Sequence, residues 1–321
     1  MKKIILFVIA AMLLCGCSST DSEDMSEEKL RIAVPSGAPS LAFYNEMSND
    51  EFMTGDAKAI LPELAGEGGS DIIVIDTVNG IKALNNGARY KLAATITFGN
   101  FYIAATGYDD DGIMNDGDYI VIFSQGATPD LVFHYIYGDI FDSNIHYVNA
   151  VSDATPCLLK GINIYDDERT ADEEPYVDYV MIAEPALSAA RAQKSDISVY
   201  ANIQDEYAKK SNGLGMVQAS VFVSDRLDHD RAIEFLNGLE EDINRLIEDP
   251  ELFAKTCEEN GLADEEIKDV FGVPNAKLAT AALKDDAIGL GFVKAIDHKN
   301  VIDKFVKIFG MERTNEEIYF Q

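Results

Sequence analysis

Three short loops of small and polar residues contain most of the groups in this sequence that could recognise a small molecule. They are Ser36-Gly37-Ala38, Asp76-Thr77 and the run from Ser124 to Thr128, and each follows an apolar stretch and precedes one with helical spacing. A helix that begins at such a loop leaves backbone N–H groups free, and nearby hydroxyl groups add further donors. Loops of this kind can hold a polar or anionic group by hydrogen bonds, without a covalent step.

A second set of candidate side chains lies at other predicted strand ends. Tyr102 belongs to an aromatic run and could stack on a flat ligand, while Asp76 and Glu184 could accept a hydrogen bond from an amine. The alternatives are structural: the hydroxyl groups could only cap helices, Tyr102 could be a core residue, and Glu184 could serve the loop before Pro185. The candidate ligand-binding residues are Ser36, Gly37, Ala38, Asp76, Thr77, Asn100, Tyr102, Gln125, Thr128 and Glu184.

The sequence contains none of the common catalytic patterns. It has no Gly-x-Ser-x-Gly elbow, no Gly-Lys-Ser/Thr phosphate loop and no Gly-x-Gly-x-x-Gly turn after a strand. The four His are scattered, and Cys157 and Cys257 lie far apart in the chain. These two cysteines could be buried free thiols or a disulfide pair. We therefore expect no catalytic residue, no metal and no cofactor.

The candidate residues need a scaffold that brings strand ends together, and the hydrophobic pattern predicts one. Short apolar runs alternate with amphipathic stretches, which predicts an α/β protein with two similar lobes, each a mostly parallel sheet flanked by helices. The predicted strands cover 30–34, 71–76, 91–97, 101–106, 119–123, 146–148, 179–183 and 217–223. The predicted helices cover 41–47, 77–86, 130–137, 154–161 and 184–193, and two helices are expected to dominate after Asp228.

The first 29 residues are predicted to lie outside the folded domain. Met1-Lys2-Lys3 and the apolar run Ile4–Leu14 form the pattern of a secretory signal, because eleven apolar residues are too few to span a bilayer. Cys17 follows Gly16 and resembles the lipid-modified cysteine of a bacterial lipobox; the alternative is a plain signal peptide. We expect a signal peptide at 1–16, a lipid on Cys17 and a flexible tether at 17–29. The protein would then be anchored at the extracytoplasmic face of the cell membrane.

Charge and length limit the class of protein further. The chain has 321 residues, of which 26 are Lys or Arg and 56 are Asp or Glu, so its formal net charge is −30. Such a surface repels phosphates, and we expect no nucleic-acid partner. The hydrophobic content of 47% and the length predict about two folded domains.

The order of these segments resembles that of a known family. Five segments resemble, in order, elements of the periplasmic binding proteins of the nitrate, sulfonate and taurine import group, namely 31–39, 71–77, 91–102, 124–130 and 177–186. The resemblance covers about Leu30 to about Phe309. It implies the type II periplasmic binding protein fold, with 30–106 and 222–321 in lobe I, 107–221 in lobe II, and a ligand cleft between the lobes.

The resemblance also implies a function. Such proteins are receptors that bind one small molecule and deliver it to the permease of an ABC importer, and we expect a monomer without catalytic activity. A sulfonate, a pyrimidine-like heterocycle or a similar compound is the implied ligand. Because no Lys or Arg lies in 35–40, 76–79 or 124–128, we favour a neutral or zwitterionic organic ligand over an inorganic anion. Two other hypotheses stay open: a secreted enzyme on the same fold, and a lipoprotein that senses or docks a protein partner.

Overall fold

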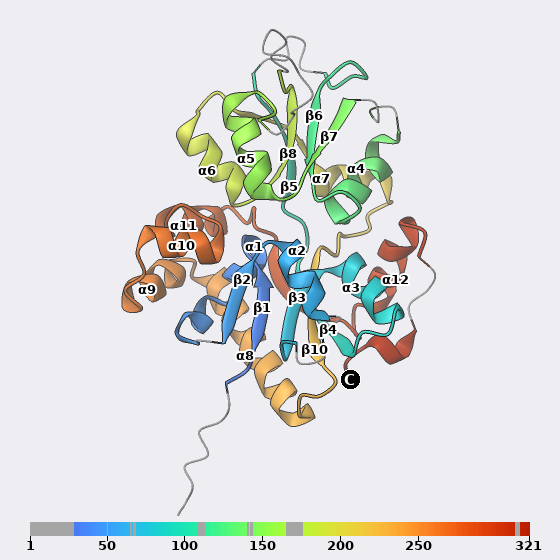
Figure 1. Ribbon diagram of the computed structural model, residues 1–321, viewed down its shortest axis with the longest axis vertical. Helices are drawn as coiled ribbons and strands as arrows, with labels where there is room; N and C mark the ends of the chain where they lie inside the picture. The colour runs from blue at the N-terminus through green and yellow to red at the C-terminus, as the bar shows by residue number, and fades with distance from the viewer. Residues whose placement is uncertain are drawn as a thin grey trace, which may run out of the picture.

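The computed structural model describes residues 29–321 except 50, 65, 67–68, 108–112, 140, 142–143, 165–175 and 312–314. The predicted signal peptide, Cys17 and nearly all of the predicted tether lie outside the described residues. Figure 1 shows two lobes, one above the other, each built around one sheet. None of the described helices combines the length and the apolar character that crossing a membrane requires.

Eleven strands of the described chain form the two sheets. The lower sheet in Figure 1 has the order β11-β4-β10-β3-β1-β2, with β1 (Ile32–Pro35), β2 (Phe52–Gly55), β3 (Ile72–Asp76), β4 (Tyr90–Thr97), β10 (Ala219–Ser224) and β11 (Leu290–Lys294). The upper sheet has the order β7-β6-β8-β5-β9, with β5 (Phe101–Ala105), β6 (Ile120–Phe123), β7 (Ile145–Val148), β8 (Tyr179–Ala183) and β9 (Ser198–Asn202).

Both sheets are mixed, although the prediction was of mostly parallel pairing. β1 pairs in parallel with β2 and β3, whereas β10 and β11 run antiparallel to their neighbours. In the upper sheet β6 is parallel to β7 and β8, whereas β5 is antiparallel to β8 and β9. For β5 and β10 the reason is that each enters its sheet from the other lobe. They begin at the interface, where the parallel strands end. The predicted two-lobed α/β architecture is confirmed.

The chain passes between the sheets twice. Residues 98–100 join β4 to β5, and residues 211–218 lead from α7 (Ile203–Lys210) to β10. Strand pairing thus assigns β5 to the upper sheet, although the sequence-based division placed 101–106 in lobe I. It also assigns all of β10, from Ala219, to the lower sheet. We use "first lobe" for 29–97 and 219–321, and "second lobe" for 101–210.

Helices flank both sheets (Figure 1). The first lobe contains α1 (Ala38–Leu41), α2 (Ala57–Ile60), α3 (Thr77–Asn85), α8 (His229–Glu248), α9 (Glu251–Glu259), α10 (Asp264–Phe271), α11 (Ala276–Lys284) and α12 (Lys299–Ile308). The second lobe contains α4 (Thr128–Tyr137), α5 (Val151–Lys160), α6 (Ala186–Gln193) and α7. Single 3-10 turns cover Tyr44–Ser48, Leu61–Leu64 and Glu316–Ile318.

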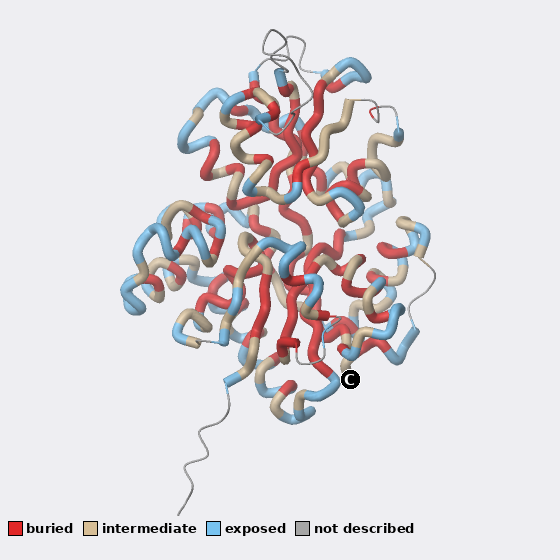
Figure 2. The backbone as a smooth tube through the Cα atoms, viewed as in Figure 1, coloured by how far each residue is buried: buried red, intermediate tan, exposed pale blue. Residues whose placement is uncertain are grey.

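The central strands are buried on both faces, which explains their unbroken apolar runs. In β3, Ile73 and Ile75 pack into one hydrophobic cluster, while Ile72 and Val74 pack into another on the opposite face. Successive side chains of a strand point to opposite faces, so a strand covered on both sides needs apolar residues throughout. Figure 2 shows this buried centre in each lobe, with exposed residues on the surrounding helices.

The helix predictions hold in the middle of the chain and are wrong at two places. The amphipathic stretch after Asp228 is α8, and its buried face has the expected spacing: Ala232, Leu236, Leu239, Ile243 and Leu246. The rest of the C-terminal region holds four further described helices and β11, not one helix. The predicted helix at 41–47 is instead the single turn α1 followed by a 3-10 turn. These elements are four to ten residues long, too short for a periodic pattern to be distinctive.

The packing of α3 on β10 generates a stability prediction. A Cβ atom added to Gly80 would lie 2.1 Å from Cζ of Phe222, so Gly80→Ala must displace a buried ring. We expect the free energy of unfolding to fall by about 1–3 kcal/mol, measured by urea unfolding. Gly238→Ala is the matched control: it lies in α8 with nothing within 4 Å of the added atom, and should raise stability by up to about 1 kcal/mol. A Gly80→Ala protein as stable as the wild type would contradict this packing.

Candidate functional site

A cavity of about 450 Å³ lies between the two lobes. Its wall includes the carboxyl ends of β1, β3, β6 and β8 and the residues just after β2 and β7. These are the six strands that take part in parallel pairing, and the end of such a sheet where its strands finish is the usual binding edge of an α/β fold. Both crossing segments contribute as well, through Asn100 and Gln218.

The cavity brings together most of the candidate residues from the sequence. Seven of the ten line it: Ser36, Gly37, Ala38, Asp76, Asn100, Gln125 and Glu184. The other three lie outside the lining: Thr77, Tyr102 and Thr128. The seven come from both lobes, so a molecule in the cavity would contact both.

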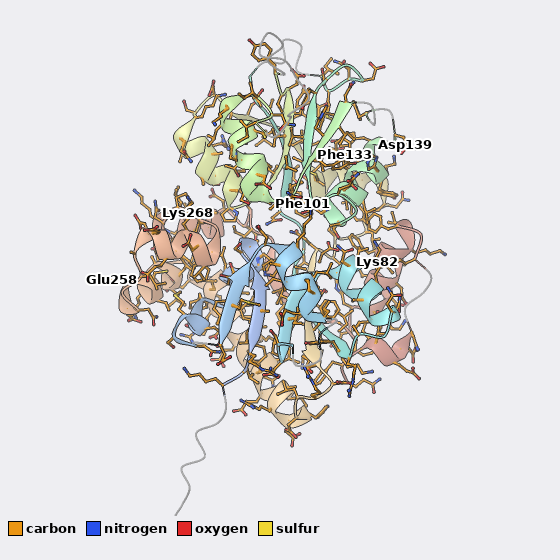
Figure 3. All side chains as sticks on the ribbon, in the orientation of Figure 1. Lys82, Phe101, Phe133, Asp139, Glu258 and Lys268 are labelled. Carbon is orange, nitrogen blue, oxygen red and sulfur yellow. The ribbon has the colours of Figure 1, made fainter. Side chains whose placement is uncertain are left out.

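The three residues outside the lining have structural contacts. Thr77 is fully buried, and its backbone N–H and hydroxyl both donate to the carbonyl of Gln218, at 2.9 and 3.2 Å. Thr128 is also fully buried at the start of α4. Tyr102 follows Phe101 on β5, and because alternate residues of a strand face opposite ways, Phe101 lines the cavity and Tyr102 does not. Figure 3 shows Phe101 between the two lobes.

The most consequential residue that sequence reasoning missed is Lys58. It is the one cationic residue among those that line the described cavity. Its Nζ donates to Oδ1 of Asn149 in the second lobe at 2.5 Å. Lys58 lies on α2, directly after β2, and neither element was predicted because both are only four residues long. Asp56, Asn79, Ser152 and Gln218 also line the cavity and were not among the candidates.

Asp76 connects the two lobes through its carboxylate. Oδ1 accepts from the backbone N–H of Asn79 at 2.9 Å, which caps α3, and Oδ2 accepts from the N–H of Thr128 in the second lobe at 3.1 Å. Burial raises the pKa of this carboxyl above its ordinary value, and the hydrogen bonds from Thr128 and Asn79 offset the rise only in part. The loop Asp76-Thr77 was predicted to supply hydrogen-bond donors, but it contributes the carboxylate of Asp76, an acceptor, to the cavity.

Glu184 has a similar environment in the second lobe. Its side chain is almost fully buried, with Oε1 accepting from the Ser188 hydroxyl and Oε2 from the Ser188 backbone N–H, both at 3.0 Å. Burial raises the pKa of Glu184, while the bonds from Ser188 and the charge of Arg191 lower it by less. Asp76 and Glu184 are thus two desolvated carboxyl groups in the wall of one cavity.

Apolar residues make up much of the remaining wall. Phe101 and Phe123 meet edge to face with ring centroids 5.8 Å apart, and both line the cavity. The rest of the apolar wall includes Pro35, Pro39, Leu61, Pro129, Val151 and Pro185. Apolar walls with a few polar groups are typical of sites for small organic molecules. Within the described ranges, no three His, Cys, Asp or Glu side chains gather as a metal site would need.

Comparison with solved structures identifies the fold. An ABC transporter structure from Parabacteroides distasonis is 20% identical, with a TM-score of 0.64 over 91% of this chain and 98% of that chain. The ligand-binding component of an ABC-type import system from Staphylococcus aureus, with zinc bound, is 12% identical (TM-score 0.61; 91% and 96% covered). The periplasmic aliphatic sulphonate binding protein SsuA from Escherichia coli is 13% identical (TM-score 0.57; 91% of each chain). This chain has the periplasmic binding protein fold.

Sequence comparison adds nothing to this assignment: no protein-family model and no curated protein matches the chain. At 12–20% identity the structural similarity establishes the fold alone. The chemistry of the residues that line the cavity is therefore the basis for inferring the ligand of this protein.

The buried carboxyl of Glu184 generates a pH prediction. Its pKa is higher in the folded protein than the ordinary 4.5, so the folded state binds the proton more tightly than the unfolded state, and stability falls as pH rises through that window. Glu184→Gln keeps the shape and removes the charge. We expect its melting temperature at pH 7 to exceed that of the wild type by roughly 2–4 °C for each kcal/mol by which the change reduces the cost of burying the charge. This gain should shrink toward pH 4.

The matched control is Asp228→Asn, which caps α8 with two backbone N–H bonds away from the cavity. It should show no such gain at pH 7. Thermal unfolding of both variants between pH 4 and 8 checks the prediction. A Glu184→Gln protein that melts below the wild type at pH 7 would mean that the hydrogen bonds from Ser188 outweigh burial.

Proposed function

We propose that this protein is the solute-binding component of an ABC-type importer and that it captures a small organic molecule between its lobes. The observation that carries the proposal is the cavity of about 450 Å³ at the lobe interface, lined from both lobes by the ends of their parallel strands. The proteins of similar fold named above support it, since two are described as parts of ABC systems and one as a sulphonate-binding protein. The role requires binding and release without a chemical step.

The seven candidate residues in the lining, together with Lys58, Asn149 and Gln218, form the proposed binding surface. Two hydrogen bonds already span the lobes at this cavity, from Lys58 Nζ to Asn149 Oδ1 and from the Thr128 N–H to Asp76. A bound molecule would add contacts to both lobes, and would thereby favour the closed arrangement over an open one. The segments 98–100 and 211–218 would be the hinge.

The remaining parts of the proposal concern location and partners. A lipid on Cys17 would anchor the domain at the extracytoplasmic face of the membrane, and residues 17–29 would give it reach. The closed, loaded domain would dock as a monomer on the permease of the importer. A sulfonate and a pyrimidine-like heterocycle are the first two compounds to test.

Ligand capture can be tested with two variants. Phe123 lines the cavity and Phe141 is equally buried in the second lobe away from it. Both Phe→Ala changes should destabilise the protein. Phe123→Ala alone should also weaken binding by about tenfold, because losing roughly 1.4 kcal/mol of apolar contact changes affinity by that factor.

The measurement is a thermal-shift screen of sulfonates, pyrimidines, amino acids, amines and inorganic anions, followed by calorimetry with the best compound and by small-angle X-ray scattering. A compound that binds and compacts the protein supports the proposal. If no compound shifts the melting temperature, and native mass spectrometry finds no molecule retained from the expression host, the receptor function is wrong.

A further inference from the structure

A row of linked hydrogen bonds lies on the hinge side of the cavity. The backbone N–H of Thr77, next to Asp76, donates to the carbonyl of Gln218 at 2.9 Å. The Gln218 amide donates to Oδ1 of Asn100 at 2.8 Å, and the Asn100 amide donates to the carbonyl of Glu184 at 2.7 Å. These bonds join the backbone next to Asp76 to the backbone of Glu184, and the side chains of both acidic residues belong to the cavity lining.

The Gln218 and Asn100 amides each donate one bond within this row, and one buried acceptor of the row has no donor within the described ranges. Gln218 is nine-tenths buried, and its Oε1 accepts from no donor among the described residues. Each carboxylate has about four lone-pair sites, and the bonds at Asp76 and Glu184 account for two apiece. No Lys or Arg in the described part of the chain forms an ion pair with either carboxylate. The charge of Lys82 lowers the pKa of Asp76, and that of Arg191 lowers the pKa of Glu184, by less than burial raises each of them. A buried acceptor without a donor is unfavourable, so this row favours a molecule that brings N–H groups.

Carboxylates of the protein accept hydrogen bonds at the helix starts that face the cavity. Four helices of eight or more residues begin at the cavity, namely α3, α4, α5 and α6. Asp76 accepts from N–H groups at the starts of α3 and α4, Glu184 from one at the start of α6, and Asp153 from the one before α5. The negative charge of these carboxylates weakens the attraction that the helix starts would otherwise exert on a ligand phosphate, sulfonate or carboxylate.

The net charge of the cavity wall and that of the whole chain are both negative. Asp56, Asp76 and Glu184 line the cavity against the single cation Lys58, whose ammonium group is held at Asn149. The whole chain has a formal net charge of −30. A field of that sign draws cations toward a cleft and repels anions.

We infer that the captured solute is an organic cation: a small molecule with a protonated amine or amidine on an apolar body. Its N–H groups would lie against Glu184 and Asp76, and its body against Phe101 and Phe123. The inference rests on the proposed receptor function and replaces the sulfonate suggested by the sequence resemblance.

The test uses compounds of one shape and three charges on the purified full-length chain. The aromatic set is benzamidine, benzamide and benzoate, and the aliphatic set is pentylamine, pentanol and pentanesulfonate. Calorimetry and thermal shift at pH 7.5 should rank the cation first in each set. Lowering the pH should weaken benzamidine binding, because protonation removes the charge of the carboxylates while the amidinium stays charged.

The groups that face these two carboxyls bear on that pH dependence. Around Asp76 they are Asn79 and Lys82 of α3 and Thr128 of α4. Around Glu184 they are Ser188 and Arg191 of α6, Asp285 after α11 and Tyr102 of β5. None of them is a histidine, so a change in affinity between pH 5 and 7.5 would report on the carboxyls.

Three variants distinguish binding at the proposed cation site from changes in stability or in net charge elsewhere. Glu184→Gln should weaken benzamidine binding at least about tenfold even though the variant is expected to be more stable. Lys58→Gln should strengthen it by roughly two- to fivefold by removing a like charge, whereas in an anion receptor it would abolish binding. Asp228→Asn, away from the cavity, should leave affinity unchanged.

The outcomes distinguish this inference from the receptor proposal. If benzoate or pentanesulfonate binds best and Lys58→Gln abolishes that binding, the protein is a receptor but the cation assignment is wrong. If the neutral compounds bind as well as the cations, the assignment is also wrong. If no compound of either set binds, the cation assignment is wrong, whereas the receptor function is refuted only by the wider screen together with native mass spectrometry.

Discussion

The side-chain amide of Asn100 joins the two crossing segments to the second lobe, in the wall of the cavity. Its Nδ2 donates to the carbonyl of Glu184 in the second lobe, and its Oδ1 accepts from Gln218 on the other crossing segment. The two places where the chain passes between sheets are thereby held side by side. Close backbone packing supports this junction, since a Cβ atom on Gly289 would lie 2.2 Å from the carbonyl oxygen of Gly99. A site at this junction is built from the same residues that set the angle between the lobes.

This shared construction couples recognition to closure. The backbone of Glu184 belongs to the junction, while its carboxylate lies in the cavity wall. Asp76 likewise caps α3 of the first lobe and accepts an N–H from α4 of the second. A molecule that pairs with these carboxylates acts directly on contacts between the lobes, without a relay through the core. The cost of the desolvation that raises the pKa of both carboxyls would be offset by the attraction of a positive charge in the cavity.

The sequence predicts the scaffold well because its central strands are buried on both faces. Unbroken apolar runs such as Ile72–Ile75 and Tyr179–Ala183 are recognisable as buried strands from the sequence alone. The loops that follow these strands lie at the same edge of the sheets, and seven of the ten candidate residues therefore line one cavity. The misses have physical causes. Lys58 follows a four-residue strand with no distinctive pattern, and the inward direction of Thr77 depends on Gln218, more than a hundred residues away. No local pattern contains such a partner.

The sequence and the structure differ in the role they give to the small-residue loops at the cavity. Small residues, hydroxyl groups and helix starts, considered one loop at a time, predict a site for a polar or anionic group, and only the lack of Lys and Arg in these loops favoured a neutral or zwitterionic ligand. Such a helix start attracts any carboxylate within reach, including one from the protein. Here Asp76 reaches from the first lobe to the start of α4, 52 residues further along the chain, and Glu184 folds back on the start of α6. Once these charges are held by backbone N–H groups, the outward sides of the carboxylates define the cavity. The same dipoles that would bind an anionic ligand then hold two carboxylates, and in the proposed receptor these two side chains, and not the fold, would decide the sign of the ligand.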